Sequence, residues 1–425
     1  PRPKPDGRSR LSANIFHIFG YALDTLARQN ASKLAFALAY SYLCGVIEVT
    51  EKTFISLIIP VYNRPQEVRE LLESLVRQTR RDFEVVVVED GSAPECSSDE
   101  VVREYADRLD IRYVRQPNGG PAAARNTGAA NARGDFFVIM DSDCLVPADY
   151  FETVYTEVEA CGIVFYGGPD MAAPDFSPLQ KAVSYSMTSV FTTGGIRGNR
   201  HSIGKFSPRS FNLGISRSLF VEVGGFSDMR IGEDIDFSMR VMATGAQARF
   251  LPDAKVCHKR RTSIRLFFKQ VFVFGTARIN LDIRHPESRK ALFALPSVFT
   301  VGSAALLLAA LCAGPWFRLA FVAVAVLWAL GTSVQWGGLL LLLFGIAYAP
   351  WWFILPFGTL MALWFVDAAV RNRSVTIGWL AVWTSFIQLY GYGLGYLYGF
   401  WLRRIRGLEE RDTYKVTRFF SQKTR

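Results

Sequence analysis

The chain has 425 residues, and this length predicts two or three domains rather than one. Half of the residues are hydrophobic; residues 292–402 carry almost no charge, whereas the preceding part mixes charged and apolar stretches as a soluble domain does. The net charge of +10 would suit nucleic-acid binding, yet much of the excess follows Leu402. A basic run beside an apolar segment is more typical of the cytoplasmic face of a membrane. We therefore expect no nucleic-acid partner.

The cysteines show no metal-binding or disulfide pattern. None of them forms a CxxC pair, so the sequence predicts neither a zinc site nor a disulfide framework. This usage suits a reducing compartment. The six residues are Cys44, Cys96, Cys144, Cys161, Cys257 and Cys312.

Residues 1–53 are predicted to form a partly helical N-terminal extension. The first ten residues are polar and rich in Pro and Arg, which predicts disorder. The apolar run Leu34–Ile47 is short for a membrane span. We expect a helix that lies on the membrane or on the soluble domain, with a true span or a processed leader as the alternatives.

Residues 54–261 are predicted to form an α/β domain. Short apolar runs rich in β-branched residues alternate with segments of helical periodicity, which indicates a sheet with right-handed crossovers. Ligands of such sheets bind beyond the carboxyl ends of the strands. The predicted strands are Phe54–Pro60, Phe83–Val88, Ile111–Val114 and Phe136–Met140, and the helices between them are Pro65–Gln78, Glu100–Leu109 and Pro121–Ala132.

The remainder is predicted to be associated with a membrane. Residues 262–292 suggest amphipathic interface helices, although Ile264–Ala277 would equally suit a helix packed on the soluble domain. We expect about four transmembrane helices within residues 293–402 and a basic cytoplasmic tail at residues 403–425. This arrangement predicts a multi-pass protein of the inner (cytoplasmic) membrane, with its soluble domain in the cytoplasm. The expected spans are 295–313, 316–334, 338–366 and 375–402, and the last contains Gly391, Gly395 and Gly399 at a spacing that favours close helix packing.

Two polar turns follow the first two predicted strands. The first contains Pro60, Tyr62 and Asn63, in the sequence PVYN, where a nucleotide could meet backbone groups. The second contains Glu89 and Asp90, in EDGS, whose carboxylates could accept hydrogen bonds from a base or a ribose. Either sequence taken alone is also compatible with a simple turn.

The segment NGGPAAARN begins the third predicted helix. Its glycines permit a ligand to approach the backbone closely, and its alanines permit tight packing against the sheet. Arg125 is the cation in this otherwise small and neutral segment. Its guanidinium could contact a base or a phosphate, or form a surface salt bridge.

Acidic residues follow the fourth strand and recur near residue 234. Asp141 and Asp143 (DSD) lie at a buried strand end, where a hard divalent cation, Mg²⁺ or Mn²⁺, would offset their repulsion and hold a diphosphate. The acids of the GEDID segment, Gly232–Asp236, could supply a general base or merely cap a helix. His258, followed by three cations, could contact a phosphate or a metal, or be structural.

Taken in this order, the motifs resemble those of glycosyltransferase family 2, the inverting enzymes with the Rossmann-like GT-A fold. The resemblance covers about Phe54 to Arg261. It implies a GT-A nucleotide-sugar domain followed by an α-helical transmembrane domain. It also implies that Asp143 and His258 bind the metal, that Asp234 is the catalytic base and that Glu233 orients the base or the acceptor. The implied donor-binding residues are Pro60, Tyr62, Asn63, Glu89, Asp90, Arg125 and Asp141.

The resemblance also bears on the acceptor. Processive members such as cellulose and hyaluronan synthases carry a QxxRW motif, which this sequence lacks, so we expect a non-processive enzyme. The intervals Tyr185–Arg197 and Phe211–Arg217 are expected to shape the acceptor side. Thr193, Asn212 and Asp236 are the candidate contacts.

The expected function is metal-dependent, inverting transfer of a sugar from a UDP- or GDP-linked donor in cell-surface glycan assembly. The acceptor would be membrane-associated, either lipid-linked or a glycan, with membrane lipids as further partners. An alternative is a polyprenyl-phosphate glycosyltransferase, whose phosphate acceptor needs no general base. More remote alternatives are a transporter with a nucleotide-sensing domain and a binding protein without catalytic activity.

Overall fold

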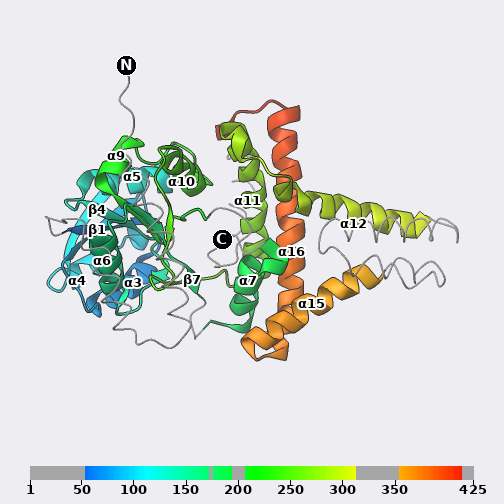
Figure 1. The fold of residues 1–425 in the computed structure, drawn as a ribbon, viewed down its shortest axis with the longest axis horizontal. Helices are drawn as coiled ribbons and strands as arrows, with labels where there is room; N and C mark the ends of the chain where they lie inside the picture. Colours follow the sequence, from blue (N-terminus) through cyan, green and yellow to red (C-terminus); the bar gives the residue numbers. More distant parts are fainter. Residues whose placement is uncertain (1–52, 172–175, 194–205, 313–353, 414–425) are drawn as a thin grey trace, which may run out of the picture. The chain divides into compact units, whose positions relative to one another are not determined.

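The computed structural model describes residues 53–171, 176–193, 206–312 and 354–413 (Figure 1). The chain divides into two compact units. The described residues of the first are Thr53 and Val154–Ile163, and most of these belong to helix α6 (Tyr150–Cys161). The second comprises Phe54–Thr153 and Val164–Arg425. The predicted extension and the run Leu34–Ile47 lie outside the described residues.

A seven-stranded sheet forms the framework of the α/β part, in the order β3-β2-β1-β4-β8-β6-β9. Strands β1 to β4 run parallel, whereas β8 is antiparallel to both β4 and β6. All four predicted strands and the helices between them are therefore confirmed. The strands are β1 (Ile55–Val61), β2 (Phe83–Asp90), β3 (Asp110–Gln116), β4 (Phe136–Ile139), β6 (Phe165–Gly167), β8 (Leu213–Ser216) and β9 (Arg249–Phe250). The helices are α3 (Pro65–Val76), α4 (Asp99–Tyr105), which follows the short η1 (Pro94–Cys96), and α5 (Pro121–Asn131).

The central strands are buried on both faces, which explains their continuous apolar sequences. Every residue of β2 is buried, as are all those of β1 except Pro60. Each fully buried Val, Ile or Leu contributes about 1.5–3 kcal/mol relative to an exposed one. Helix α5 lies close to β1, because a Cβ added at Gly128 would be 2.4 Å from Cγ2 of Ile58. The small residues of α5 thus serve the close packing predicted from the sequence.

The parallel topology brings the motifs to one edge of the sheet. PVYN, EDGS, NGGP and DSD follow β1, β2, β3 and β4 in turn, so all four lie at carboxyl ends of parallel strands. A second sheet has three strands in the order β5-β10-β7. Its first strand, β5, begins directly after DSD. Its strands are β5 (Cys144–Leu145), β7 (Asp170–Met171) and β10 (Val256–His258). This small sheet carries His258 to the DSD motif.

The helices between β7 and β10 belong to two parts of the fold, because Ala182 and Met187 of the first helix pack against the C-terminal helices. Helices α7 (Pro178–Thr188) and α8 (Val190–Thr193) occupy the interval expected to shape the acceptor side. Helix α9 (Arg217–Glu222) follows β8. Helix α10 (Glu233–Ala243) begins within the acidic segment, so the acids occupy its first turn.

Helix α11 (Ile264–Arg284) is longer than expected and packs against α16 (Val375–Phe400). Ten residues of α11 are buried, which fits the packed-helix alternative, and the expected role at a membrane interface stays a prediction. The glycine repeat permits this contact: a Cβ at Gly395 would lie 1.9 Å from the carbonyl oxygen of Phe272, and one at Gly399 would lie 3.0 Å from Thr276. The packing role predicted for the repeat is confirmed.

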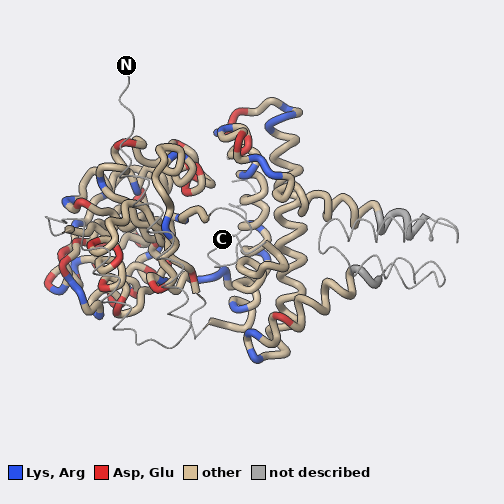
Figure 2. The backbone as a smooth tube through the Cα atoms, in the orientation of Figure 1, with Lys and Arg blue, Asp and Glu red and all other residues tan. Residues whose placement is uncertain are grey.

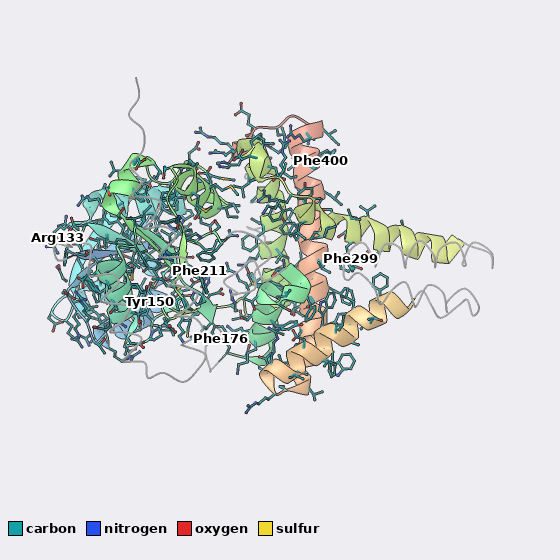
Figure 3. The ribbon with its side chains drawn as sticks, in the orientation of Figure 1. Arg133, Tyr150, Phe176, Phe211, Phe299 and Phe400 are labelled. Atoms are coloured by element: carbon teal, nitrogen blue, oxygen red, sulfur yellow. The ribbon has the colours of Figure 1, made fainter. Side chains whose placement is uncertain are left out.

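Two further helices pack on α16. Helix α12 (Leu295–Cys312) contacts it through Phe299, whose ring centroid is 5.3 Å from that of Tyr390 (Figure 3). Helix α15 (Ile354–Asn372) precedes α16, and Trp364 of α15 donates a hydrogen bond to the carbonyl of Phe191 in α8. The short helices η2 (Pro286–Ser288) and η3 (Ala291–Ala294) join α11 to α12, and η4 (Trp401–Ile405) follows α16.

These helices coincide in part with the expected membrane spans. Figure 2 shows few charged residues along α12 and α16, which correspond to the expected spans 295–313 and 375–402. Within the described ranges, however, none of the helices has the combination of length and hydropathy that a membrane span requires. The expected span 316–334, most of 338–366 and residues 414–425 of the tail lie outside those ranges.

Candidate active site

The turns after β1 and β2 are tied together. Asn63 has a left-handed backbone with φ of 54°, and its amide N–H donates to Oγ of Ser92 at 2.7 Å. Its side-chain oxygen accepts a 2.9 Å hydrogen bond from the amide of Ala93. Pro60 lies within β1 opposite Val88, while Tyr62 remains 48% exposed. Of the PVYN residues, the Tyr62 ring is therefore the group that is open to a ligand.

Asp90 organises the glycine loop that precedes α5. Its carboxylate accepts hydrogen bonds from the amides of Gly119 and Gly120, both at 2.8 Å, and from the side chains of Gln116 and Asn118. Gly120 has a φ of 89°, and nothing lies within 4 Å of a Cβ added there. At Gly120 the loop thus leaves space beside the backbone at the edge of the sheet, so a ligand could approach it closely, as the sequence predicted.

Glu89 points into the scaffold rather than toward a ligand. Its carboxylate accepts a 2.8 Å hydrogen bond from the amide of Ser98 and a 3.0 Å bond from the hydroxyl of Tyr113. The hydroxyls of Ser92 and Ser98 donate to it as well. Only 4% of the residue is exposed, so Glu89 braces the turn after β2, and a direct contact with the donor stays a prediction.

Arg125 joins the two acidic motifs. This α5 residue is buried, and its guanidinium donates to Oδ1 of Asp141 at 2.9 Å and to Oε1 of Glu233 at 2.7 Å. Burial raises the pKa of Glu233 to about 7, because it and the charge of Asp234 outweigh the attraction of Arg125. Arg125 is therefore a buried connector and not the surface salt bridge that the sequence also allowed.

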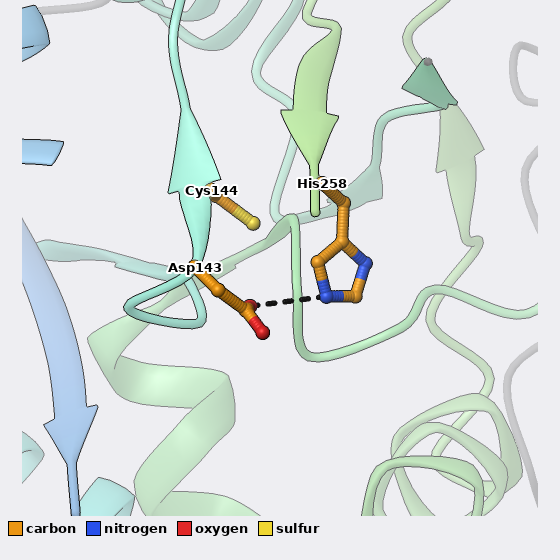
Figure 4. A group of neighbouring side chains, drawn as sticks. All are labelled: Asp143, Cys144 and His258. Atoms are coloured by element: carbon orange, nitrogen blue, oxygen red, sulfur yellow. Dashed lines mark ion pairs between the residues drawn. The ribbon is translucent and has the colours of Figure 1, made fainter. Parts of the chain in front are cut away.

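Asp143 is held by two cationic or potentially cationic side chains. Its Oδ1 lies 3.1 Å from Nε2 of His258, and its Oδ2 accepts a hydrogen bond from Arg64 (Figure 4). Burial would raise the pKa of Asp143, but the hydrogen bonds and charges of His258 and Arg64 outweigh it and hold that pKa below its usual range. Asp143 thus presents a carboxylate beside the ring of His258, and the two could hold a divalent cation once the imidazole is neutral.

His258 is held in place from several sides. Its ring stacks on Phe211, with centroids 5.3 Å apart and planes 21° from parallel (Phe211 is labelled in Figure 3). Its Nδ1 lies 3.9 Å from Oδ2 of Asp170, a buried carboxylate that pairs with Arg260 at 2.6 Å. None of the sequence motifs pointed to Arg64 or Asp170, and Phe211 was expected only as part of the acceptor-side interval Phe211–Arg217. Asp170 follows a Gly-Gly-Pro turn, which was the one local signal available.

The three acids of the first turn of α10 differ in exposure. The side chain of Asp234 is 21% exposed, compared with 10% for Glu233 and 3% for Asp236. Asp234 accepts a hydrogen bond from the amide of Ile235, and its Oδ2 lies 3.6 Å from Nη1 of Arg209. It is therefore the acid of this turn that is best placed to meet a substrate.

Asp236 is used within the protein instead. It accepts from Ser227 at 2.8 Å, from Nε of Arg240 at 3.0 Å and pairs with Nε2 of His285 at 2.8 Å. Burial would raise its pKa, but these hydrogen bonds outweigh burial and lower it. The structure thus corrects the expected contact with the acceptor, because Asp236 links α10 to the end of α11.

The other two acceptor-side candidates are also engaged by the scaffold. Asn212 is fully buried, accepts a 2.6 Å hydrogen bond from the hydroxyl of Tyr150 and donates at 2.7 Å to the carbonyl of Ala254. Thr193 donates its hydroxyl to the carbonyl of Met187 at 3.0 Å. Asn212 therefore supports the strand, and a contact with the acceptor remains a prediction for Thr193 alone.

Comparison with known proteins finds a family model and several relatives that match the α/β part. Residues 56–220 match the sequence model described as glycosyl transferase family 2. The chain is 30% identical over 247 residues to the pre-mycofactocin glycosyltransferase of Mycobacterium tuberculosis, covering 56% of this chain and 49% of that protein. It is 27% identical to the glycosyltransferase AglE of Haloferax volcanii, covering 59% of this chain and 81% of the relative. The chain thus spans about half the length of the first of these relatives.

Two solved structures were also matched. One is the mannosyltransferase PcManGT from Pyrobaculum calidifontis in complex with GDP-Man and Mn²⁺, at 20% identity and a TM-score of 0.46, covering 85% of this chain and 94% of that one. The other is S. aureus TarS in complex with UDP-GlcNAc, at 15% identity and a TM-score of 0.40, covering 83% and 92%. Because both scores are below 0.5, neither structure bears on the function of this chain.

The mainly parallel sheet and the site at its edge define a GT-A-like α/β domain. Residues 56–220 match the family 2 model, and this match together with the named relatives supports a glycosyltransferase. The resemblance noted from the motifs is thereby confirmed for this part of the chain.

Proposed function

We propose that the protein transfers a sugar from a nucleotide-diphosphate sugar to an acceptor, with inversion and with the help of a divalent metal. The observation that carries this proposal is the buried link from Asp141 through Arg125 to Glu233. It ties the DSD motif, which would face the donor diphosphate, to the turn that bears Asp234. The motif that would hold the donor diphosphate and the turn that bears the proposed base would therefore keep a fixed position relative to each other.

The residues at DSD suit a divalent metal. Asp143 offers an ionised oxygen and His258 an imidazole nitrogen, with 3.1 Å between the two atoms. Mg²⁺ prefers oxygen ligands alone, whereas imidazole nitrogen also suits transition metals, so this pair favours Mn²⁺ over Mg²⁺. When bound, the metal would stabilise the negative charge of the departing diphosphate. Arg64, which pairs with Asp143, would then be available to the phosphates.

The donor nucleotide is proposed to lie against the carboxyl ends of β1 and β2. The exposed ring of Tyr62 offers a surface on which a base can stack. The backbone of Gly119 and Gly120, fixed by Asp90, would admit the close approach of a ligand. Arg125 would act as a positioning residue, because its buried guanidinium is occupied by Asp141 and Glu233.

Asp234 is proposed to be the general base. The side chain of Asp234 is the most exposed of the three acids in the first turn of α10, so an acceptor hydroxyl would reach it most easily. Its carboxylate would take the proton of an acceptor hydroxyl while the oxygen attacks the anomeric carbon. The bond from that carbon to the diphosphate would break on the opposite face, so one displacement inverts the configuration.

A lipid-linked acceptor and a membrane location are part of the proposal. Large apolar side chains on α16 are exposed, among them Trp379 at 55% and Trp383 at 64%. Such a surface would suit a lipid environment, where an acceptor with an apolar tail is held. A polyprenyl-phosphate acceptor remains the second candidate, because this surface suits it equally.

A donor screen tests the proposal. Purified protein would be mixed with UDP-, GDP- and dTDP-sugars plus Mn²⁺, and nucleotide release measured with and without lipid acceptors. Asp234→Asn should lower transfer by about 10²–10⁴-fold with nucleotide binding unchanged, while Asp107→Asn, an exposed acid, should match the wild type. Full activity in Asp234→Asn would favour the phosphate acceptor. If the folded protein released no nucleotide from any donor of the panel, the proposal would be refuted.

A further inference from the structure

Cys144 stands beside the two proposed metal ligands. It lies opposite His258 in the antiparallel pairing of β5 and β10, and directly opposed residues present their side chains on the same face. Asp143 precedes β5 in a turn, so the usual alternation of side chains does not turn it away from Cys144. Figure 4 shows the thiol and the carboxylate directed toward the imidazole.

The three groups are close enough to share one ion. The ligand atoms of Asp143, Cys144 and His258 all lie within 4.8 Å of one another, the only such trio among the described residues. Around a tetrahedral Zn²⁺, with bonds of about 2.0–2.3 Å, ligand atoms are separated by about 3.5 Å. Movements of about 1 Å would therefore suffice.

The thiol of Cys144 is enclosed by the fold and contacts a backbone oxygen. Cys144 is fully buried, and its Sγ lies 3.5 Å from the carbonyl oxygen of Phe211. The ring of the same Phe211 stacks on His258, so one residue covers both candidate ligands. Behind the imidazole, Oδ2 of the buried Asp170 lies 3.9 Å from Nδ1, beyond hydrogen-bond range, so it places a negative charge near the ring without fixing its tautomer.

We infer that Cys144 is a third protein ligand of the metal site and that its sulfur adds to the preference of this site for a thiophilic cation, Zn²⁺ or Co²⁺, over Mn²⁺ or Mg²⁺. This inference rests on the metal site of the proposed function and extends its donor set. Sulfur and imidazole ligands select later transition metals, whereas Mg²⁺ and Mn²⁺ favour oxygen. On binding, the S–H bond of Cys144 breaks, a metal–sulfur bond forms and the proton passes to solvent.

Cobalt absorption tests the inference directly. Co²⁺ added to the purified protein should give the near-ultraviolet charge-transfer band of a cobalt–thiolate bond. Cys144→Ser should lose that band and bind Co²⁺ and Zn²⁺ about tenfold or more weakly, with little change in Mn²⁺ affinity. Cys161→Ser, at the end of α6, is the matched control and should keep both band and affinity. An unchanged band in folded Cys144→Ser overturns the inference.

A second measurement needs no Cys144 variant. Calorimetric titration of the wild type in buffers of different ionisation enthalpy should show about one more proton released with Zn²⁺ than with Mn²⁺. Equal release overturns the thiolate ligand. Asp143→Asn separates the two hypotheses: if it abolishes binding of Mn²⁺ and Co²⁺ while Cys144→Ser leaves the cobalt spectrum intact, the proposed metal site stands and only the third ligand fails. If Asp143→Asn binds both metals like the wild type, the proposed site itself fails.

Discussion

Arg125 donates a 2.7 Å hydrogen bond to Glu233, although 108 residues separate them in the chain. The same guanidinium holds Asp141 at 2.9 Å. A buried cation is stable only while its carboxylate partners are present, because Arg125 and Glu233 have largely lost their water, although Asp141 keeps 31% of its side chain exposed. This relationship makes the stability of the domain and the geometry of its site depend on the same residue.

Replacement of Arg125 is therefore expected to be severe. Arg125→Met leaves two carboxylates without their buried partner and should lower the free energy of unfolding by about 3–5 kcal/mol. Arg125→Lys should lose less, because it keeps the charge but not the two-armed donor. Arg103→Met, which removes an exposed pair with Asp99, should have little effect. Chemical denaturation measures all three, and equal losses at positions 125 and 103 would contradict the buried link.

Glu233 should make stability depend on pH in a defined direction. Its pKa is raised to about 7 in the folded protein by burial and by the charge of Asp234, so the folded state binds this proton more tightly than the unfolded chain. The stabilisation is present below the pKa of an ordinary glutamate and is lost as pH rises through 7. Relative to Glu233→Gln, the wild type should lose up to about 3 kcal/mol between pH 4.5 and 7. Denaturation curves across this range measure the difference.

The control for this prediction is Asp107→Asn, which removes an exposed acid. Its unfolding free energy should run parallel to that of the wild type at every pH. A constant offset between wild type and Glu233→Gln would instead mean that Glu233 is ionised in the folded protein throughout this range.

The glycine contact between α11 and α16 should be intolerant of a methyl group. A Cβ at Gly395 would lie 1.9 Å from the backbone oxygen of Phe272, so Gly395→Ala must push the helices apart and should cost about 1–3 kcal/mol or more. Gly358→Ala on α15 is the matched control, since nothing lies within 4 Å of its added Cβ. It should be neutral or slightly stabilising because alanine favours helix. Thermal unfolding compares the two, and an equally tolerant Gly395 would refute the close packing.

The exposed tryptophans of α16 provide a test of membrane association. If they meet lipid, Trp379→Ser combined with Trp383→Ser should reduce flotation of the protein with phospholipid vesicles. Val221→Ser on α9 removes another exposed apolar side chain, 67% exposed, and should leave flotation unchanged. An equal flotation of all three proteins would remove the support that these residues give to a membrane location.

The sequence by itself determined the α/β framework and the order of its motifs. Apolar runs such as that of β2 can be recognised in the sequence because both faces of a central strand are buried. The polar turn after each parallel strand must then lie at the carboxyl edge of the sheet. The glycine repeat of α16 could also be recognised in the sequence, since its spacing is a local property of one helix.

Only the tertiary structure decided which polar groups are available for chemistry. Glu89 and Asp236 resemble site residues in sequence, but burial and hydrogen bonds from distant residues turn them into scaffold. Cys144 carries no pattern of its own and becomes a candidate ligand only because β10 pairs with β5 and places His258 opposite it. Hydrophobic periodicity can be recognised from neighbouring residues. The pairing of charges across the fold depends instead on strand order and burial, which cannot be read from any local stretch of sequence.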